Sequence, residues 1–160
     1  MERRTLLAAP LLLLAGCGFQ LRQAPAFVFK TISISVADTS TLGNELKRSI
    51  AASGAVAVVT PDRAEVILEV TQDQREKVVV GLNASGQVRE FQLRIRFKFK
   101  LRTPGGKELI PETELLQQRD ISFNESAVLS KEAEEGLLYR DMQTDIVQQL
   151  LRRLAAVKAL

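Results

Sequence analysis

The chain has 160 residues, a formal net charge of +3, no histidine, no tryptophan and a single cysteine. Without histidine or a cysteine pair, zinc and copper lack their usual ligands, and a Ser-His-Asp relay cannot be assembled. The sequence also lacks a G-x-S-x-G nucleophile motif, and no pair of carboxylates is singled out by its spacing. We therefore predict that the protein is not an enzyme and uses neither a metal nor a cofactor.

The N-terminal residues have the pattern of a bacterial lipoprotein signal. Two arginines precede an apolar stretch over residues 5–15, and residues 14–17 read Leu-Ala-Gly-Cys, which looks like a lipobox. A membrane-spanning helix needs roughly 20 apolar residues, and this stretch is shorter. We predict that residues 1–16 are removed as a signal peptide and that Cys17 is lipidated. The alternative is an ordinary secretory signal with an unrelated cysteine.

Processing at this site would leave a short tether followed by one domain. Residues 17–26 contain Pro25 and show no clear hydrophobic period, which indicates a tether, and residues 27–160 have the length of a single domain. The residue after a lipidated cysteine usually decides between the two membranes, and Gly18, unlike an aspartate, implies the outer one. We expect a protein anchored in the outer membrane through the lipid on Cys17, facing the periplasm, with no nucleic acid partner.

Hydrophobic periodicity predicts a strand and a helix at the start of the domain. Apolar side chains alternate with serines over residues 32–36, which is typical of a half-buried strand. The run of N-cap residues at 38–41 then precedes leucine and isoleucine side chains at i, i+4 spacing, and Gly54 supplies a C-terminal stop. This pattern predicts a helix of about three turns, followed by a brief extended segment over residues 55–59.

The middle of the chain predicts three long strands. The first runs from residue 64 to 80 with a possible bulge, and residues 83–86 provide a hairpin turn. The second strand, over residues 91–102, has apolar side chains at every odd position and glutamine, arginine or lysine at every even one. After a turn at residues 103–106, we expect a third strand over 108–123. Its odd positions include Leu109, Leu115, Ile121 and Phe123, and its even positions include Glu108, Glu112, Glu114 and Asp120.

The two faces of this second hairpin predict its register. A slip by one residue would set charged side chains against the apolar row, so both faces are satisfied only when the loop is centred on Gly105. The expected pairs are Arg102 with Glu108, Lys98 with Glu112, Arg96 with Glu114, Leu101 with Leu109, and Ile95 with Leu115.

The C-terminal segment predicts a long amphipathic helix. Ser130 is a plausible N-cap, glutamates follow in the first turn, and apolar side chains recur at i, i+4 spacing from Leu138 to Leu154, so we expect a helix over residues 131–157. Together the elements predict an α+β fold of two layers: a single mixed or antiparallel sheet of about four strands with two helices on one face, in the order β-α-β-β-β-α. The other sheet face would be polar and free to meet a partner.

Four stretches resemble the LptE family of lipopolysaccharide-assembly lipoproteins. They are residues 17–22 (Cys-Gly-Phe-Gln-Leu-Arg), 89–93 (Arg-Glu-Phe-Gln-Leu), 119–125 (Arg-Asp-Ile-Ser-Phe-Asn-Glu) and 142–154. Their order and spacing carry the resemblance, which spans nearly all of the mature chain. It implies a non-enzymatic outer-membrane lipoprotein that plugs and helps assemble the large β-barrel LptD and assists lipopolysaccharide transport to the outer leaflet.

The resemblance also implies cations at one end of the domain that contact the phosphates of lipid A. Lys131 occupies such a position, although a first-turn surface lysine is an alternative reading. Ala84 stands at the turn where a further cation is expected, and Arg89 is a nearby substitute. We predict that the cationic face of the second strand contacts the partner, through Arg94, Arg96, Lys98 and Lys100. The alternative is that this face is only a solvated surface. The alternative for the whole chain is a generic outer-membrane lipoprotein scaffold, such as a pilotin-like partner of another assembly.

Overall fold

The computed structural model describes residues 26–160. The predicted signal peptide, Cys17 and all but the last residue of the predicted tether lie outside these described residues. The bounds of the elements are β1 Thr31–Ser35, α2 Thr41–Ala52, β2 Ala57–Val58, β3 Val66–Leu82, β4 Val88–Arg102, β5 Glu108–Ser122 and α3 Val128–Ala155, with 3₁₀ turns η2 Pro61–Arg63 and η3 Glu125–Ala127.

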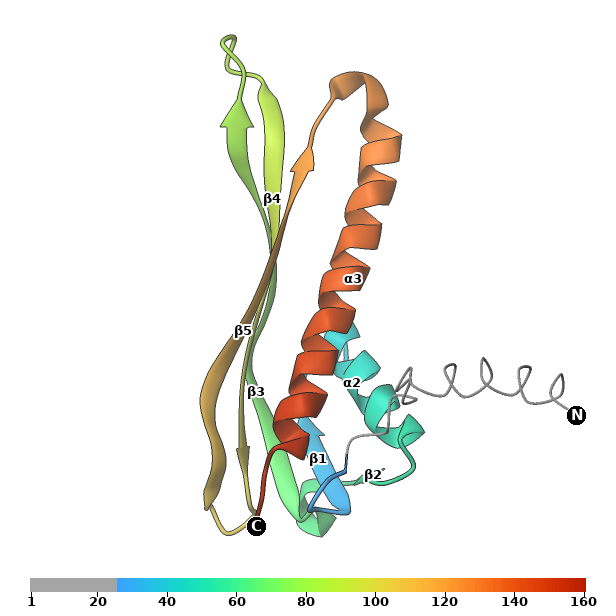
Figure 1. Ribbon diagram of the computed structural model, residues 1–160, viewed down its shortest axis with the longest axis vertical. Helices are drawn as coiled ribbons and strands as arrows, with labels where there is room; N and C mark the ends of the chain where they lie inside the picture. Colours follow the sequence, from blue (N-terminus) through green and yellow to red (C-terminus); the bar gives the residue numbers. More distant parts are fainter. Residues whose placement is uncertain (1–25) are drawn as a thin grey trace, which may run out of the picture.

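A single mixed sheet with both helices packed on the same face makes up two layers (Figure 1). The strand order is β2-β1-β3-β4-β5, with β1 parallel to both of its neighbours and the β3–β4 and β4–β5 pairs antiparallel. The predicted α+β class is confirmed, but the described part of the chain forms five strands rather than four. The additional strand is β2, which forms within the predicted brief extended segment because Ala57 N–H donates to the Lys30 carbonyl at 2.8 Å.

Helix α2 begins and ends where its capping residues predict. The Ser40 hydroxyl accepts a hydrogen bond from the Gly43 backbone N–H at 2.8 Å, which satisfies one of the free donors of the first turn. Leu46 and Ile50 are fully buried against the sheet. Gly54, just beyond the end of the helix, has a φ of 66°, a left-handed conformation that glycine adopts without strain.

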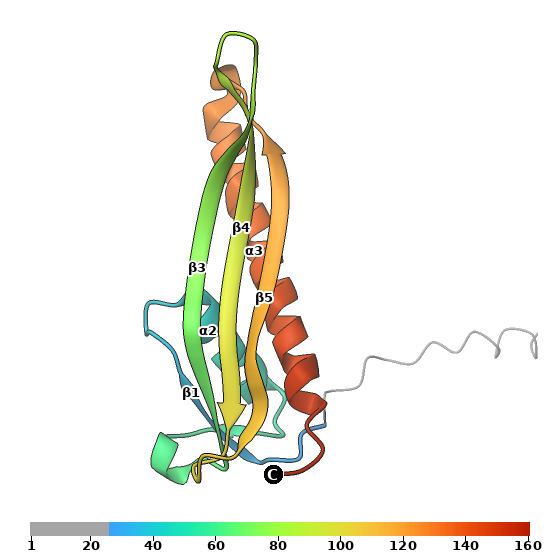
Figure 2. The same cartoon turned by 90° about the vertical axis from the view of Figure 1, so that its left-hand side faces the viewer.

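Strands β3 and β4 form a hairpin that extends far past the end of β1 (Figure 2). Their register is regular between Gln72 and Val79, with irregularities at Thr71 and Val80 on either side. The predicted bulge is thus confirmed. The apolar odd positions of β4 lie in the core between the sheet and the helices: Leu93, Ile95, Phe97, Phe99 and Leu101 are each at most 1% exposed.

Pro111 displaces the predicted register between β4 and β5. Arg102 faces Glu108 as predicted, but β5 then contains two extra residues relative to β4, in two irregularities next to Pro111. Proline has no N–H to donate to a ladder, so it is accommodated in an edge strand at a bulge. The other predicted pairs are therefore wrong: Leu101 faces Ile110, Lys98 faces Glu114, Arg96 faces Leu116 and Ile95 faces Gln117.

Helix α3 begins at Val128, earlier than predicted. Ser130 is not its N-cap, because this serine lies inside the helix and its hydroxyl donates to the Ala127 carbonyl at 2.9 Å. The chain turns upstream instead, where the Asn124 side chain accepts from the Ser126 N–H at 3.0 Å and starts η3. The helix ends at Ala155, close to the predicted end.

The two halves of α3 differ in their packing. Between Val128 and Asp141 no residue is fully buried. From residue 142 onward a continuous stripe is buried against the sheet and α2, and its members are Met142, Gln143, Ile146, Val147, Leu150, Leu151 and Leu154. The core therefore fills the half of the domain that contains β1 and α2. The opposite half, which carries the β3–β4 turn and the start of α3, is called the distal end below.

Candidate functional site

The four cations predicted to contact a partner form one row on the sheet face away from the helices. They project from even positions of β4, whose odd positions are buried. Carboxylates on both neighbouring strands pair with three of them. The ion pairs are Arg96–Glu114 at 2.8 Å, Lys98–Glu114 at 3.6 Å and Lys100–Glu69 at 2.9 Å. The fourth cation, Arg94, donates a hydrogen bond from Nε to Gln92 Oε1 at 2.7 Å. This set of four, called the β4 row below, thus belongs to a mixed-charge surface.

Glu69 is the most strongly held carboxylate on this surface. It accepts from Lys100 at 2.9 Å and from Arg102 at 2.6 Å, and these two hydrogen bonds lower the pKa of its carboxyl below the usual value. Each side chain in the pairs remains between 26% and 37% exposed, so the surface keeps its charged groups in reach of solvent. Such a face suits a partner that also carries both signs of charge.

Lys131 lies in the first turn of α3 at the distal end. Its Nζ donates to Ser122 Oγ at 3.0 Å and pairs with Glu134 at 2.8 Å, so the lysine joins the helix to the end of β5. Its side chain is 22% exposed. It lines a small cavity of about 50 Å³, whose apolar wall includes Phe91, Phe123 and Val128.

Arg89 reaches the same end from β4. The Phe123 backbone N–H donates to the Arg89 carbonyl at 2.7 Å, which places this arginine beside the segment that holds Ser122, the hydrogen-bond partner of Lys131. The structure therefore brings the two cations predicted for phosphate contact to one end of the domain. Arg89 is exposed. Ala84 lies in the adjacent β3–β4 turn.

A third distal cation, Lys77, escaped sequence reasoning. Its Nζ lies 4.4 Å from the centroid of the Phe91 ring and 2.6 Å from a carboxylate oxygen of Glu135 on α3, and it lines the same cavity as Lys131. In the sequence it belongs to a polar run in β3, whose composition indicates only the continuation of a strand. The available signal was its odd-numbered position after the bulge, which puts Lys77 on the helix side of the sheet.

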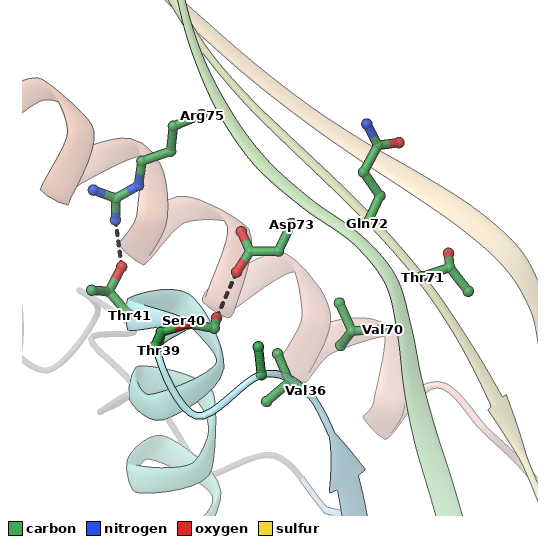
Figure 3. A pocket seen from close by; sticks show the side chains of 10 residues that line it. Val36, Thr39, Ser40, Thr41, Val70, Thr71, Gln72, Asp73 and Arg75 are labelled. Atoms are coloured by element: carbon green, nitrogen blue, oxygen red, sulfur yellow. Dashed lines mark hydrogen bonds between the residues drawn. The ribbon is translucent and has the colours of Figure 1, made fainter.

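A polar network joins α2, α3 and β3 where β1 ends, and Figure 3 shows its contacts between the start of α2 and β3. The Ser40 hydroxyl donates to Asp73 at 2.5 Å, and the Arg75 guanidinium donates to Thr41 at 2.5 Å and to the buried Gln143 amide oxygen at 2.5 Å. These residues, except Gln143, line an open cavity of about 470 Å³. Every buried side-chain nitrogen or oxygen among residues 26–160 has a hydrogen-bond partner, so the network is satisfied within the fold.

A comparison with known protein families identifies the family of this chain. A sequence model described as LptE, lipopolysaccharide-assembly, matches residues 29–154. The chain belongs to the LptE family. This is the family that the four stretches of sequence resemble, and it is a family of lipopolysaccharide-assembly lipoproteins.

Known proteins are similar to this chain over most of their own length. The LPS-assembly lipoprotein LptE of Yersinia enterocolitica is 27% identical over 96% of this chain and 75% of its own length, and that of Pectobacterium atrosepticum is 26% identical over 94% and 83%. The solution structure of lipoprotein B from Nitrosomonas europaea is 36% identical, covers 87% of this chain and 91% of its own, and superimposes with a TM-score of 0.76.

A further structure supports the fold alone. The crystal structure of rare lipoprotein B from Shewanella oneidensis has 20% identity and a TM-score of 0.66, and covers 79% of this chain and 95% of its own. Neither α-helix in the described part of this LptE family member combines the length and apolar character that crossing a bilayer requires.

Proposed function

We propose that this LptE family member is an outer-membrane lipoprotein, anchored through Cys17 and facing the periplasm, that plugs and helps assemble an LptD-like β-barrel and assists lipopolysaccharide transport to the outer leaflet. The observation that carries the proposal is the family match over residues 29–154, together with the lipobox ahead of it. The fold supports it with a polar sheet face for a protein partner and a cationic distal end for a phosphorylated lipid.

For the lipid, the proposal assigns Lys131 and Arg89 to the phosphate groups, with Lys77 as a third cation beside them. Phosphate oxygens form charge-assisted hydrogen bonds with lysine and arginine, and these are stronger than neutral ones. The apolar wall of the cavity beside Lys131 supports contact with the hydrophobic part of the same lipid.

Lipid binding is tested by capture of labelled lipopolysaccharide on the immobilised chain. We expect Lys131→Asp to lower capture severalfold, and Lys131→Asp combined with Arg89→Asp to lower it further. Each change replaces a cation that donates hydrogen bonds to phosphate with a carboxylate that repels it. Lys158→Asp, and Lys158→Asp combined with Arg153→Asp, make the same changes of net charge near the C-terminus, far from the distal end, and serve as the matched controls for the single and the double variant. Equal capture by the double variant and its control would remove this assignment.

For the protein partner, the proposal places the β4 row against the barrel. Reversal of Arg96 and Lys98 to glutamate should weaken co-purification with the barrel, because the two introduced glutamates would repel carboxylates on the partner. The same change leaves Glu114 facing like charges within the sheet, so a third variant adds Glu114→Lys and restores the ion pairs in reversed order.

The reversed-pair variant separates folding from binding. Restored thermal stability with co-purification still weakened would support direct contact of the row with the barrel. Recovery of both would mean that the double reversal acted through the sheet itself, and the contact proposal would be withdrawn. Lys47→Glu with Arg48→Glu on α2 provides a control with the same net change of charge.

The pilotin-like alternative predicts a different stable partner. It would be favoured if mild detergent extraction of outer membranes recovered this chain with a secretion or surface assembly and without an LptD-like barrel. The polar sheet face is common to both readings, so the identity of the co-extracted protein distinguishes them.

A further inference from the structure

The distal part of β3 has one edge without a neighbouring strand. Strand β1 pairs with β3 only from Val66 to Glu69, and the strand order puts β1 on the side of β3 opposite β4. Beyond Glu69, β3 continues to Leu82 and pairs along this length with β4 alone among the described strands. Figure 2 shows β3 running well past the upper end of β1. Its backbone groups on the β1 side therefore face no strand.

This free edge is also the most apolar exposed strand segment in the described chain. Val78, Val79, Val80 and Leu82 are 37%, 45%, 48% and 60% exposed, respectively. Since successive side chains of a strand point to opposite faces, both faces of the edge are apolar. Proteins usually protect a free edge with charge, proline or a short strand, because an unprotected apolar edge is a template for pairing with another chain.

The other two edges of the sheet have such protection. Strand β2 is only two residues long, and β5 carries Pro111 with two irregularities in its first half. Strand β3 also has irregularities, at Val80 and before Leu82, but it has no proline between Gln74 and Leu82. In β3 the charged side chains on the helix side are already engaged by the protein itself, as with Arg75 on Gln143 and Lys77 on Glu135. They hold α3 in place, and on the edge itself the Glu76 carbonyl already accepts a hydrogen bond from α3.

One hydrogen bond indicates which backbone groups face outward. The Tyr139 hydroxyl, from α3, donates to the Glu76 main-chain carbonyl at 2.8 Å, so this carbonyl has a partner outside the β4 ladder. In a strand, the N–H and C=O of one residue point to the same side, and alternate residues share that side. Gln74 and Val78 therefore present their backbone groups to the free edge, as Glu76 does.

We propose that an extended segment of the barrel polypeptide adds to this edge as a further strand, along β3 from Gln74 to Leu82. The inference rests on the proposed function, since it takes the barrel as the partner. A peptide backbone is the ligand that can satisfy a row of N–H and C=O groups, and β-branched or other apolar side chains on the added strand would cover the valines on both faces. The edge borders the sheet face that carries the β4 row, so one partner can contact both.

The experiment compares hydrogen exchange in the full-length chain alone and in its complex with the co-expressed barrel. We expect the amides within residues 74–82 to exchange at least about tenfold more slowly in the complex, as new strand hydrogen bonds require. The corresponding segment on the opposite edge, residues 113–122, is the internal reference. A second measurement uses Val78→Pro, which removes the outward N–H, and Val78→Thr, which retains it.

Val78→Pro should lower recovery of the barrel about tenfold, whereas Val78→Thr and the control Leu116→Thr, an exposed apolar residue on β5, should change it less than about threefold. If the complex forms with the edge amides unprotected, strand addition is excluded and the proposed function stands. If no complex forms, both fall. Equal protection of the edge by lipopolysaccharide micelles alone would indicate that acyl chains occupy it. Protection that rises with the concentration of this protein alone would indicate a second copy of the protein. Either result overturns the proposal.

Discussion

The two ends of this domain are built differently, although β3, β4 and α3 run through both. At the end that contains β1 and α2, the sheet is five strands wide and a cluster of fully buried leucine, isoleucine and phenylalanine side chains fills the space beneath the helices. At the distal end the sheet is three strands wide and the first half of α3 buries no residue fully. One end supplies the stability of the domain, and the other carries exposed cations and apolar side chains that suit contact with ligands and partners.

Removal of a core side chain should show the largest contrast between the ends. Phe97 is fully buried, and Phe97→Ala should lower the free energy of unfolding by about 3–5 kcal/mol, since it loses apolar burial and leaves a cavity. Leu137, in the distal half of α3, is 57% exposed, and Leu137→Ala should change the same quantity by less than about 0.5 kcal/mol. Urea denaturation of the two variants measures both values. Similar losses would show that the distal end shares the core's stability.

Gln143 marks the boundary between the ends and should give the next largest effect. Its amide accepts from Thr41 at 2.8 Å and donates to Glu45 at 2.5 Å, in addition to the bond from Arg75. Gln143→Leu keeps the approximate volume but removes one hydrogen bond each from Thr41, Glu45 and Arg75, which should cost about 1–3 kcal/mol. The same denaturation assay applies.

Coupling can be tested by repeating this substitution with Arg75→Met. If the polar network is responsible, the two losses should be clearly less than additive, because the second substitution removes one of the groups that has already lost a hydrogen bond in the first. Additive losses would instead point to altered packing around the leucine.

The hydrogen bond at the Ser40 N-cap should contribute less to the free energy of unfolding, and it acts at the α2 end alone. Ser40→Ala removes the acceptor for the Gly43 N–H, which should lower the free energy of unfolding by about 1 kcal/mol. Ser40→Asp retains an acceptor at the N-cap but places a carboxylate near Asp73, the present hydrogen-bond partner of Ser40, so it should recover only part of the loss. Thermal unfolding by circular dichroism compares the three proteins, and an unchanged midpoint in Ser40→Ala would count against the cap.

The sequence predicts the α2 end better than the distal end for a physical reason. Apolar alternation in β4 and i, i+4 spacing in α2 report burial directly, so the predicted helix layer and the long strands are confirmed. The start of α3 is exposed and carries no such period, and there the predicted cap at Ser130 was wrong. The register of β5 failed because charge pairing at the sheet surface is weak, whereas Pro111 acts on the backbone and displaces the pairs by a larger energy.

The same distinction applies to the candidate site. The β4 row was readable because alternation fixes its side of the sheet, but its pairing with Glu69 required knowledge that β3 lies beside β4. Lys77 became visible only when the fold set it on Phe91 and opposite Glu135. Lys131 and Arg89 were predicted from family resemblance, and their placement at one end depends on contacts between residues far apart in the chain.

The smallest effect concerns the charged face, where pH provides the test. The pKa of Glu69 is lowered in the folded protein, chiefly by its hydrogen bond with Lys100, so the ion pair stabilises the fold above the usual carboxyl pKa of about 4.3. This contribution is lost as the pH falls through the lowered value, because protonation removes the charge that both cations contact. Glu69→Gln lacks it at every pH and should be less stable by about 0.2–1 kcal/mol at neutral pH, as for other exposed pairs. Urea titrations at intervals from pH 7 to pH 2 should show the two proteins converging at the acid end, whereas a constant difference would assign the loss to packing of the side chain instead of its charge.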